Sequence, residues 1–396
     1  MKSVKRRLKT TIPSGKETYI SEETVSHDAQ GHEGHDGHRP RNLGVLDSLF
    51  HLDADWGTSL AYILPLSLSL TGRVAPLYMI IISFIMFVVA NGYKVICKHN
   101  PDGGGVYSSL KKVNKFMAVV GALLLITDYI VTQALSVTDA FHYLQLEALF
   151  EHGGALSALS PLIVHNAVPL WTTIILILLT IINWRGPHFS AKFAGIASAS
   201  TFLLALPLAV IALPLVPQGL MNMGHFNESI FNILRNTTAV LLALSGVEAI
   251  SNMTGIMKDP EATSRKALNI ELVKVIFTTL VLGIAMNALP PSVAFEGHTD
   301  SATGQYIIEQ GEVERIDFGC VSAMVSHRVR GEEYECPKHH FNKARPDMLV
   351  AMAEYLVHGR LGQIYGLLIG LAYGLLLIFA GNTALIDITN VTYSLA

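Results

Sequence analysis

Long apolar runs recur along the chain from about residue 56 onward, and they constrain the fold more than any other feature. The hydrocarbon core of a bilayer is about 30 Å thick, so a helix of about 20 apolar residues crosses it. Only 15% of the 396 residues are charged and the mean hydropathy is +0.42, whereas soluble domains are about 25% charged. The sequence therefore predicts an all-α polytopic membrane protein.

Eight apolar segments are long enough to be predicted spans. They cover residues 56–72, 74–93, 116–141, 168–184, 193–216, 231–256, 271–290 and 362–386. We expect residues 1–44 to form a disordered, His-rich cytoplasmic tail, residues 45–396 a transmembrane domain, and residues 291–361 an external loop within it. Lys and Arg gather in the short loops after the second, fourth and sixth spans. The positive-inside rule therefore predicts a cytoplasmic N-terminus, and we expect a plasma or inner membrane location.

Charge and motif content bear on the class of function. The net charge of −3 gives no field that would attract nucleic acid. The sequence has no Ser/His/Asp, Cys/His or His-Glu-x-x-His arrangement of the kind that supports catalysis. We therefore expect neither an enzyme nor a cofactor.

The first span opens with the motif Asp-Trp-Gly-Thr-Ser-Leu-Ala-Tyr, from Asp55 to Tyr62. Residues seven apart share one helix face, so the carboxylate, the hydroxyls and the phenol are expected to line one path suited to a partly dehydrated cation. Gly57 would let the helix unwind and expose backbone carbonyls. The alternative is that Asp55 only caps the helix at the water interface.

The third span carries a second polar stripe. Tyr129, Thr132 and Ser136 fall at i, i+3 and i+7, on one face of an otherwise apolar helix. Asp128 lies about 100° around the helix from Tyr129 and is expected to serve a neighbouring cavity rather than the same ion. Hydrogen bonding between helices is the alternative role for such hydroxyls, but the acid beside them favours a functional role.

The sixth span holds an acid in mid-membrane. Glu248 follows Ser245, Gly246 and Val247, and glycine permits local unwinding. An acid at that depth requires a proton or a positive partner, so Glu248 is a candidate for proton coupling. The alternative is a neutral Glu that holds two helices together.

Two further clusters lie outside the spans. The tail contains His27, His32, His35 and His38, which form a weak candidate for a metal site against a simple solvated tail. In the predicted external loop, Cys320 and Cys336 either form a disulfide or stay free thiols. A zinc site with the nearby histidines ranks below both alternatives; those histidines are His327, His339 and His340.

Residues 50–396 resemble the amino acid–polyamine–cation (APC) transporter superfamily, most closely its potassium–proton symporters of the KUP and KimA type. The motif from Asp55 to Tyr62 is similar to the KUP pattern, and the stripe from Asp128 to Ser136 is similar to that of KimA. Residues 245–252 resemble the superfamily's broken sixth helix.

That resemblance implies a LeuT/APC-type bundle of two inverted repeats, with broken helices 1 and 6 meeting at the midplane, and this chain is expected to stop after helix 8. It also implies that side chains of the first and third spans coordinate potassium: Asp55, Tyr62, Tyr129, Thr132 and Ser136. Asp128 and Glu248 would handle the coupling proton.

The expected function is secondary active import of potassium with protons by alternating access. One alternative is an amino-acid permease of the same fold, in which amide groups at the helix breaks would meet the substrate carboxylate. Another is a transporter-like sensor that transports nothing by itself. The expected partners are potassium, protons, the lipid bilayer, and either a second copy or another chain that completes the fold.

Overall fold

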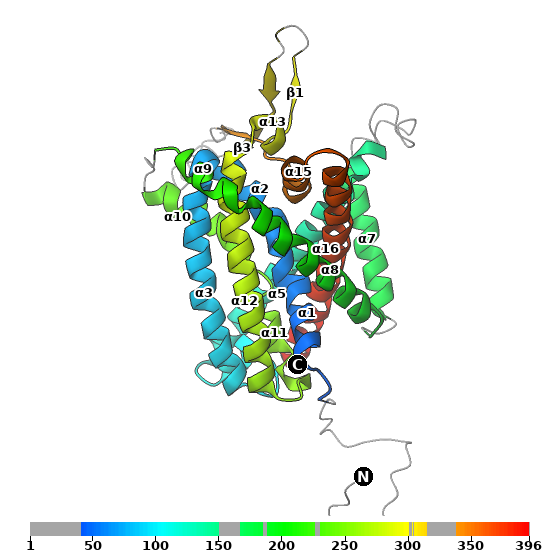
Figure 1. Cartoon of the computed structure of the whole chain (residues 1–396). Helices are drawn as coiled ribbons and strands as arrows, with labels where there is room; N and C mark the ends of the chain where they lie inside the picture. Colours follow the sequence, from blue (N-terminus) through cyan, green and yellow to red (C-terminus); the bar gives the residue numbers. More distant parts are fainter. Residues whose placement is uncertain are drawn as a thin grey trace, which may run out of the picture. The chain divides into compact units, whose positions relative to one another are not determined.

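The structure is a computed structural model, and it describes residues 41–149, 167–184, 188–225, 230–300, 303, 305–314 and 338–395. In this part of the chain, five helical stretches are long and apolar enough to cross a membrane, and two shorter apolar helices accompany them. The long helices run alongside one another, and two short two-stranded β-sheets lie at one end (Figure 1). The prediction of an all-α polytopic membrane protein is therefore confirmed.

The first helix is broken. It consists of α1 (Val45–Asp55), the 3₁₀ turn η1 (Trp56–Thr58) and α2 (Ser59–Thr71). The predicted start at residue 56 is wrong, because the polar residues of α1 lower its hydropathy although its inner face is buried. Asp55 is therefore inside the helix, at the break, and not a cap at the water interface.

The middle helices follow in order along the chain. They are α3 (Ala75–His99), α4 (Gly105–Lys111), α5 (Lys115–Tyr143), α7 (Ala167–Trp184), α8 (His188–Ala212) and α9 (Val216–Met221), with 3₁₀ turns at Gly72–Val74, Leu146–Leu149 and Leu213–Leu215. The start of α5 is capped by Asn114, whose side-chain oxygen accepts from the backbone N–H of Phe116 at 2.8 Å. A side-chain acceptor of this kind satisfies an N–H that has no partner within the helix.

The sixth helix is also broken. It comprises α10 (Ile230–Val240), the 3₁₀ turn η5 (Leu241–Leu244), a turn over 245–248, the single-turn helix α11 (Ala249–Asn252) and η6 (Thr254–Ile256). α10 contacts α2, while α11 contacts α1, so the two broken helices run side by side in opposite directions (Figure 1). Broken helices 1 and 6 are confirmed.

The seventh helix, α12 (Pro260–Ala285), begins well before the predicted start at residue 271. Asp259 caps it by accepting from the N–H of Ala262 at 3.0 Å, and proline fits the first turn of a helix. Its first turns are polar, which is why a search for apolar runs misses them. The 3₁₀ turn η7 (Met286–Ala288) follows.

The predicted external loop contains regular structure where it is described. It holds the short helices α13 (Pro291–Ala294) and α15 (Met348–Leu356), and strands β1 (Gly297–Thr299), β2 (Tyr306–Ile308), β3 (Gln310–Glu314) and β4 (Lys338–Asn342). β1 pairs antiparallel with β2 and β3 with β4, with Gly297 opposite Ile308 and Gln310 opposite Asn342. The last helix is α16 (Gly359–Leu395).

The end of the predicted tail is also ordered. Leu43 forms an isolated parallel β-bridge with Met257, directly after the sixth helix. Its N–H donates to the carbonyl of Ile256 at 3.0 Å, and its carbonyl accepts from the N–H of Lys258 at 3.0 Å. The tail prediction is therefore too long by at least residues 41–44.

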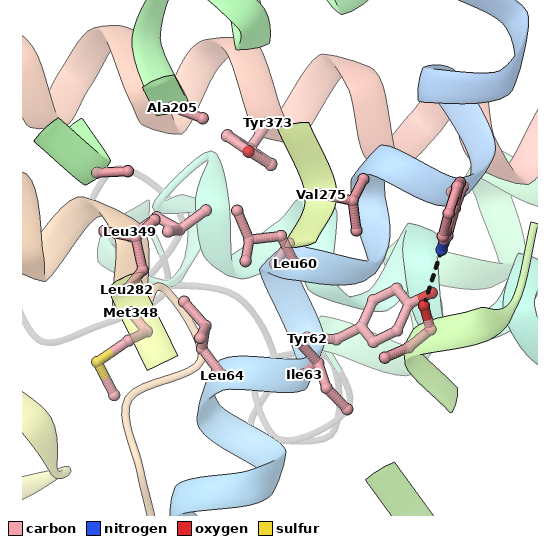
Figure 2. Close-up of a cluster of buried hydrophobic side chains, with 14 of the residues drawn as sticks. Leu60, Tyr62, Ile63, Leu64, Ala205, Val275, Leu282, Met348, Leu349 and Tyr373 are labelled. Atoms are coloured by element: carbon pink, nitrogen blue, oxygen red, sulfur yellow. Dashed lines mark hydrogen bonds between the residues drawn. The ribbon is translucent and has the colours of Figure 1, made fainter. Parts of the chain in front are cut away.

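The core is built around α2. Figure 2 shows Leu60, Tyr62, Ile63 and Leu64 packed among buried side chains of α8, α12, α15 and α16, including Tyr373. The outer faces are apolar as well; Phe84 of α3 and Val273 of α12 are 68% and 70% exposed. An apolar surface on both the inside and the outside is what a bilayer requires of a bundle of helices.

Candidate functional site

The break in the first helix is stabilised by its own hydroxyls. Thr58 Oγ1 donates to the carbonyl of Asp55 at 2.5 Å, and Ser59 Oγ donates to the carbonyl of Trp56 at 2.6 Å. Side chains of this type compete with the regular helical pattern for backbone groups. The motif that predicted a site therefore also produces the local 3₁₀ turn.

The break in the sixth helix is centred on Gly246. Its φ of +97° is one that L side chains rarely adopt, and Ser245 before it is extended, with ψ of 133°. The N–H of Gly246 donates to Glu248 Oε1 at 3.3 Å. Glu248 is only 5% exposed, so the acid lies inside the protein beside the unwound backbone.

The two breaks touch each other. A Cβ atom at Gly246 would lie 2.6 Å from the backbone nitrogen of Trp56 and 2.8 Å from Cγ of Asp55, closer than real Cβ contacts. Trp56 Nε1 also donates to the carbonyl of Ala243 at 3.1 Å. Only glycine permits this approach, so it places Asp55 directly against the unwound part of the sixth helix.

Asp55 is fully buried, and within the described residues neither of its carboxyl oxygens has a hydrogen-bond partner. The same holds for the hydroxyls of Tyr62 on α2 and Ser136 on α5. Asp387 of α16 is also fully buried and interacts electrostatically with Asp55. Burying polar oxygens without partners is costly, so such a group is typical of a site that binds something.

The other residues predicted on the third helix meet the sixth. Thr132 and Ser245 share a hydrogen bond of 2.6 Å between their hydroxyls, and Ser245 Oγ donates to Asp128 Oδ2 at 3.1 Å. Asn252 Nδ2 donates to the hydroxyl of Tyr129 at 2.9 Å. The face of α5 singled out by its hydroxyls therefore lies on the broken helix, with Tyr129 and Thr132 already hydrogen-bonded and Ser136 not.

A cavity of about 440 Å³ adjoins these groups between α3, α5 and the sixth helix. Asp128, Ser245, Glu248 and Tyr93 supply polar atoms to its lining, and leucine and valine side chains supply the rest. Asp128 thus faces this cavity, whereas Asp55 lies behind the sixth helix break. Asp55 and Asp128 both interact electrostatically with Glu248, so the acids converge on the region of the breaks.

The remaining predicted sites fall largely outside the described residues. These are the tail histidines, His27, His32, His35 and His38, and the two loop cysteines, Cys320 and Cys336. Among the residues that are described, no group of three or more His, Cys, Asp or Glu is placed to hold a metal ion. The metal and disulfide predictions therefore stay predictions.

Sequence reasoning misses one buried charge cluster. Asp53 of α1 forms an ion pair with Lys274 of α12, and Lys274 Nζ also lies 3.2 Å from Glu271 Oε1. All three side chains are at most 4% exposed. A Glu and a Lys three residues apart inside an apolar helix were the available signal, but they stand at the predicted start of a span, where charges are ordinary.

Comparison with known families agrees with this architecture. The family model described as amino acid permease matches residues 56–304, a stretch that holds both helix breaks, Asp128 and Glu248 and begins directly after Asp55. No curated protein matches the chain. The match covers more than half of the sequence and includes the region where the breaks meet. The chain therefore belongs to the amino acid permease family, within the APC superfamily of integral membrane transporters.

Proposed function

We propose that the chain is a secondary active transporter that imports potassium together with protons by alternating access. In this proposal the ion is held by five side chains of the first and third helices: Asp55, Tyr62, Tyr129, Thr132 and Ser136. Asp128 and Glu248, which line the adjoining cavity, handle the coupling proton. The N-terminus lies in the cytoplasm, as the basic loops favour.

The observation that carries the proposal is the unpartnered carboxylate of Asp55. A carboxylate at membrane depth normally faces a partner or a transported ion. Both of its oxygens are buried without hydrogen bonds in the described residues, and the buried hydroxyls of Tyr62 and Ser136 lack hydrogen-bond partners there as well. Oxygen atoms alone, with one formal charge, suit a weakly hydrated monovalent cation whose water shell they replace.

An amino-acid substrate is the second candidate, and the family match favours it. Broken helices can present amide groups to a substrate carboxylate. The acids around the breaks argue against an amino-acid substrate. Asp55, Asp128 and Glu248 interact with one another electrostatically. Among the described residues, none of the three takes part in an ion pair. Such a group of acids repels a carboxylate and attracts a cation.

The test is uptake of radioactive rubidium, a potassium substitute, into proteoliposomes that contain the purified chain. We expect uptake by the unmodified protein and a loss of roughly tenfold to a hundredfold in Asp55→Asn, since a contact to a charged group contributes about 1.5–3 kcal/mol. Asp47→Asn is the matched control, because it is the same substitution at an exposed position of α1. It should leave uptake unchanged.

Tyr62→Phe removes only the buried hydroxyl and should weaken rubidium uptake by a smaller factor than Asp55→Asn. Accumulation of an amino acid without any rubidium uptake would overturn the potassium proposal in favour of the second candidate. Equal rubidium uptake in Asp55→Asn and in the unmodified protein would contradict the assigned site.

A further inference from the structure

A second group of ionisable residues lies beside the first helix break. Lys274 of α12 is 4% exposed, is paired with Asp53 of α1, and lies 3.2 Å from Glu271 Oε1. Its ammonium nitrogen is also 4.1 Å from the centre of the Phe202 ring of α8. An ammonium held by two carboxyl groups and an aromatic face is stabilised in its charged form.

Asp53 has the contacts of an ionised carboxylate. One oxygen meets Lys274, and the other accepts hydrogen bonds from the hydroxyls of Ser198 and Thr201, the latter at 3.0 Å. Three donors therefore converge on this side chain. Donors on all sides favour the charged form of a buried acid.

Glu271 has different surroundings. Its Oε1 is near Lys274, but its Oε2 has no hydrogen-bond partner in the described residues although the side chain is fully buried. With Lys274 and Asp53 both charged, an ionised Glu271 would leave one uncompensated negative charge in a bundle that spans a bilayer. Such a charge is strongly disfavoured, and one proton on Glu271 removes it.

Among the residues that the structure describes, no other charged group in contact with the cluster supplies this compensation. From α16, Tyr373 interacts electrostatically with Glu271. From α8 come the hydroxyls of Ser198 and Thr201 and the ring of Phe202, and from α1 comes Asp53. Among these described partners Lys274 is the one cation, and it is balanced by Asp53.

The cluster also adjoins the proposed ion site. A Cβ atom at Gly57, in the first helix break, would lie 2.8 Å from Cγ of Asp53 and 2.9 Å from Nζ of Lys274. The same break places Asp55 against Gly246 on the sixth helix. The first helix thus carries one acid toward the ion site and another toward the charge cluster, two residues apart.

We propose that Glu271 is a proton-binding site of the transport cycle, separate from the acids that line the cavity. The role in transport rests on the proposed function, whereas the bound proton does not. Release of the proton changes the net charge of the cluster from zero to −1, and it does so where α1 is held to α12 and α8. Proton occupancy at Glu271 therefore sets how firmly the first helix is held.

Infrared difference spectroscopy of the purified full chain in lipid tests the proton directly, because a protonated carboxyl group has a carbonyl stretch separate from that of a carboxylate. At neutral pH, Glu271→Gln should remove one such component from the spectrum. Glu261→Gln, the same change on an exposed, ion-paired position of α12, should remove none. An unchanged protonated-carboxyl signal in a folded Glu271→Gln protein would overturn the proposal.

If Glu271→Gln does not fold, Lys274→Gln gives a second measurement. Without the ammonium, Asp53 and Glu271 are both expected to hold protons, so the protonated-carboxyl signal should grow. A signal that stays constant or falls in this variant would contradict the assignment.

Transport then separates the two proposals. Glu271→Gln should still exchange rubidium when its concentration is equal on both sides of the membrane. An inward proton gradient should stimulate rubidium uptake about tenfold less in this variant than in the unmodified protein. Full stimulation in this variant would refute the coupling role. Absence of rubidium transport in the unmodified protein would instead refute the proposed function, while the infrared result still decides whether Glu271 binds a proton.

Discussion

At the scale of single residues, Trp56 holds the two helix breaks together. Its indole N–H donates to the carbonyl of Ala243, whose usual helical donors are engaged elsewhere: the N–H of Gly246 goes to Glu248, and that of Val247 goes to the carbonyl of Leu244. The side chain is fully buried. An unwound carbonyl thus depends on a side chain from another helix.

We expect Trp56→Phe to lower the free energy of unfolding by about 1–3 kcal/mol, the cost of leaving a buried carbonyl without a donor. Trp171→Phe is the matched control. Trp171 Nε1 donates to the carbonyl of Val137 at the same 3.1 Å, but Val137 lies inside the regular helix α5 and keeps its helical donor. Denaturation in detergent measures both, and equal losses would argue against a special role for Trp56.

At the scale of elements, the sequence predicts the breaks better than the helix ends. Gly57 and Gly246 indicate unwinding because glycine stands beside hydroxyls and acids within apolar runs. The helix starts at Val45 and Pro260 are not predicted, because a hydropathy average counts a polar residue in the same way whether its side chain is buried or exposed. The cluster around Lys274 is not predicted either, because its members lie on helices that are far apart in the sequence.

The glycine at the sixth helix break gives a sharp prediction. Gly246→Ala should lower the free energy of unfolding by about 2–6 kcal/mol, since it combines about 1–3 kcal/mol of backbone strain with a similar cost of overpacking against Trp56. Gly92→Ala, inside α3 with no atom within 4 Å of the added Cβ, should instead be neutral or stabilise by up to about 1 kcal/mol.

Thermal unfolding of the two variants in the same detergent provides the comparison. A Gly246→Ala protein as stable as the Gly92→Ala protein would mean that the breaks can separate without cost.

At the scale of the whole molecule, the bridge between Leu43 and Met257 ties the start of the first helix to the end of the sixth. The exposed ion pair of Arg41 with Asp102 at 2.9 Å and that of Lys98 with Glu261 at 2.9 Å lie in the segments around this bridge. Exposed pairs contribute only about 0–1 kcal/mol each, so these two add little to the stability of this end. Alternating access requires one end of the bundle to open, and exposed ion pairs can separate at little cost.

A disulfide across this bridge should therefore arrest transport. In Leu43→Cys/Met257→Cys, bridged positions lie within about 5 Å, inside the range of a disulfide. We expect oxidation to abolish rubidium uptake and a reductant to restore it.

The control is His298→Cys/Ile307→Cys, which crosslinks two paired positions of the β1–β2 hairpin. Its uptake should not change on oxidation. Continued uptake by the fully crosslinked Leu43→Cys/Met257→Cys protein would show that this end stays closed throughout the cycle.

The contact between Gly246 and the backbone at Trp56 has one more consequence. Because Gly246 lies directly against the backbone of Asp55 and Trp56, where there is no room even for a Cβ atom, a shift of one segment along the other would bring a neighbouring side chain into collision, so the two segments must move as a coupled pair. A spectroscopic label attached to either segment would then report the displacement of both.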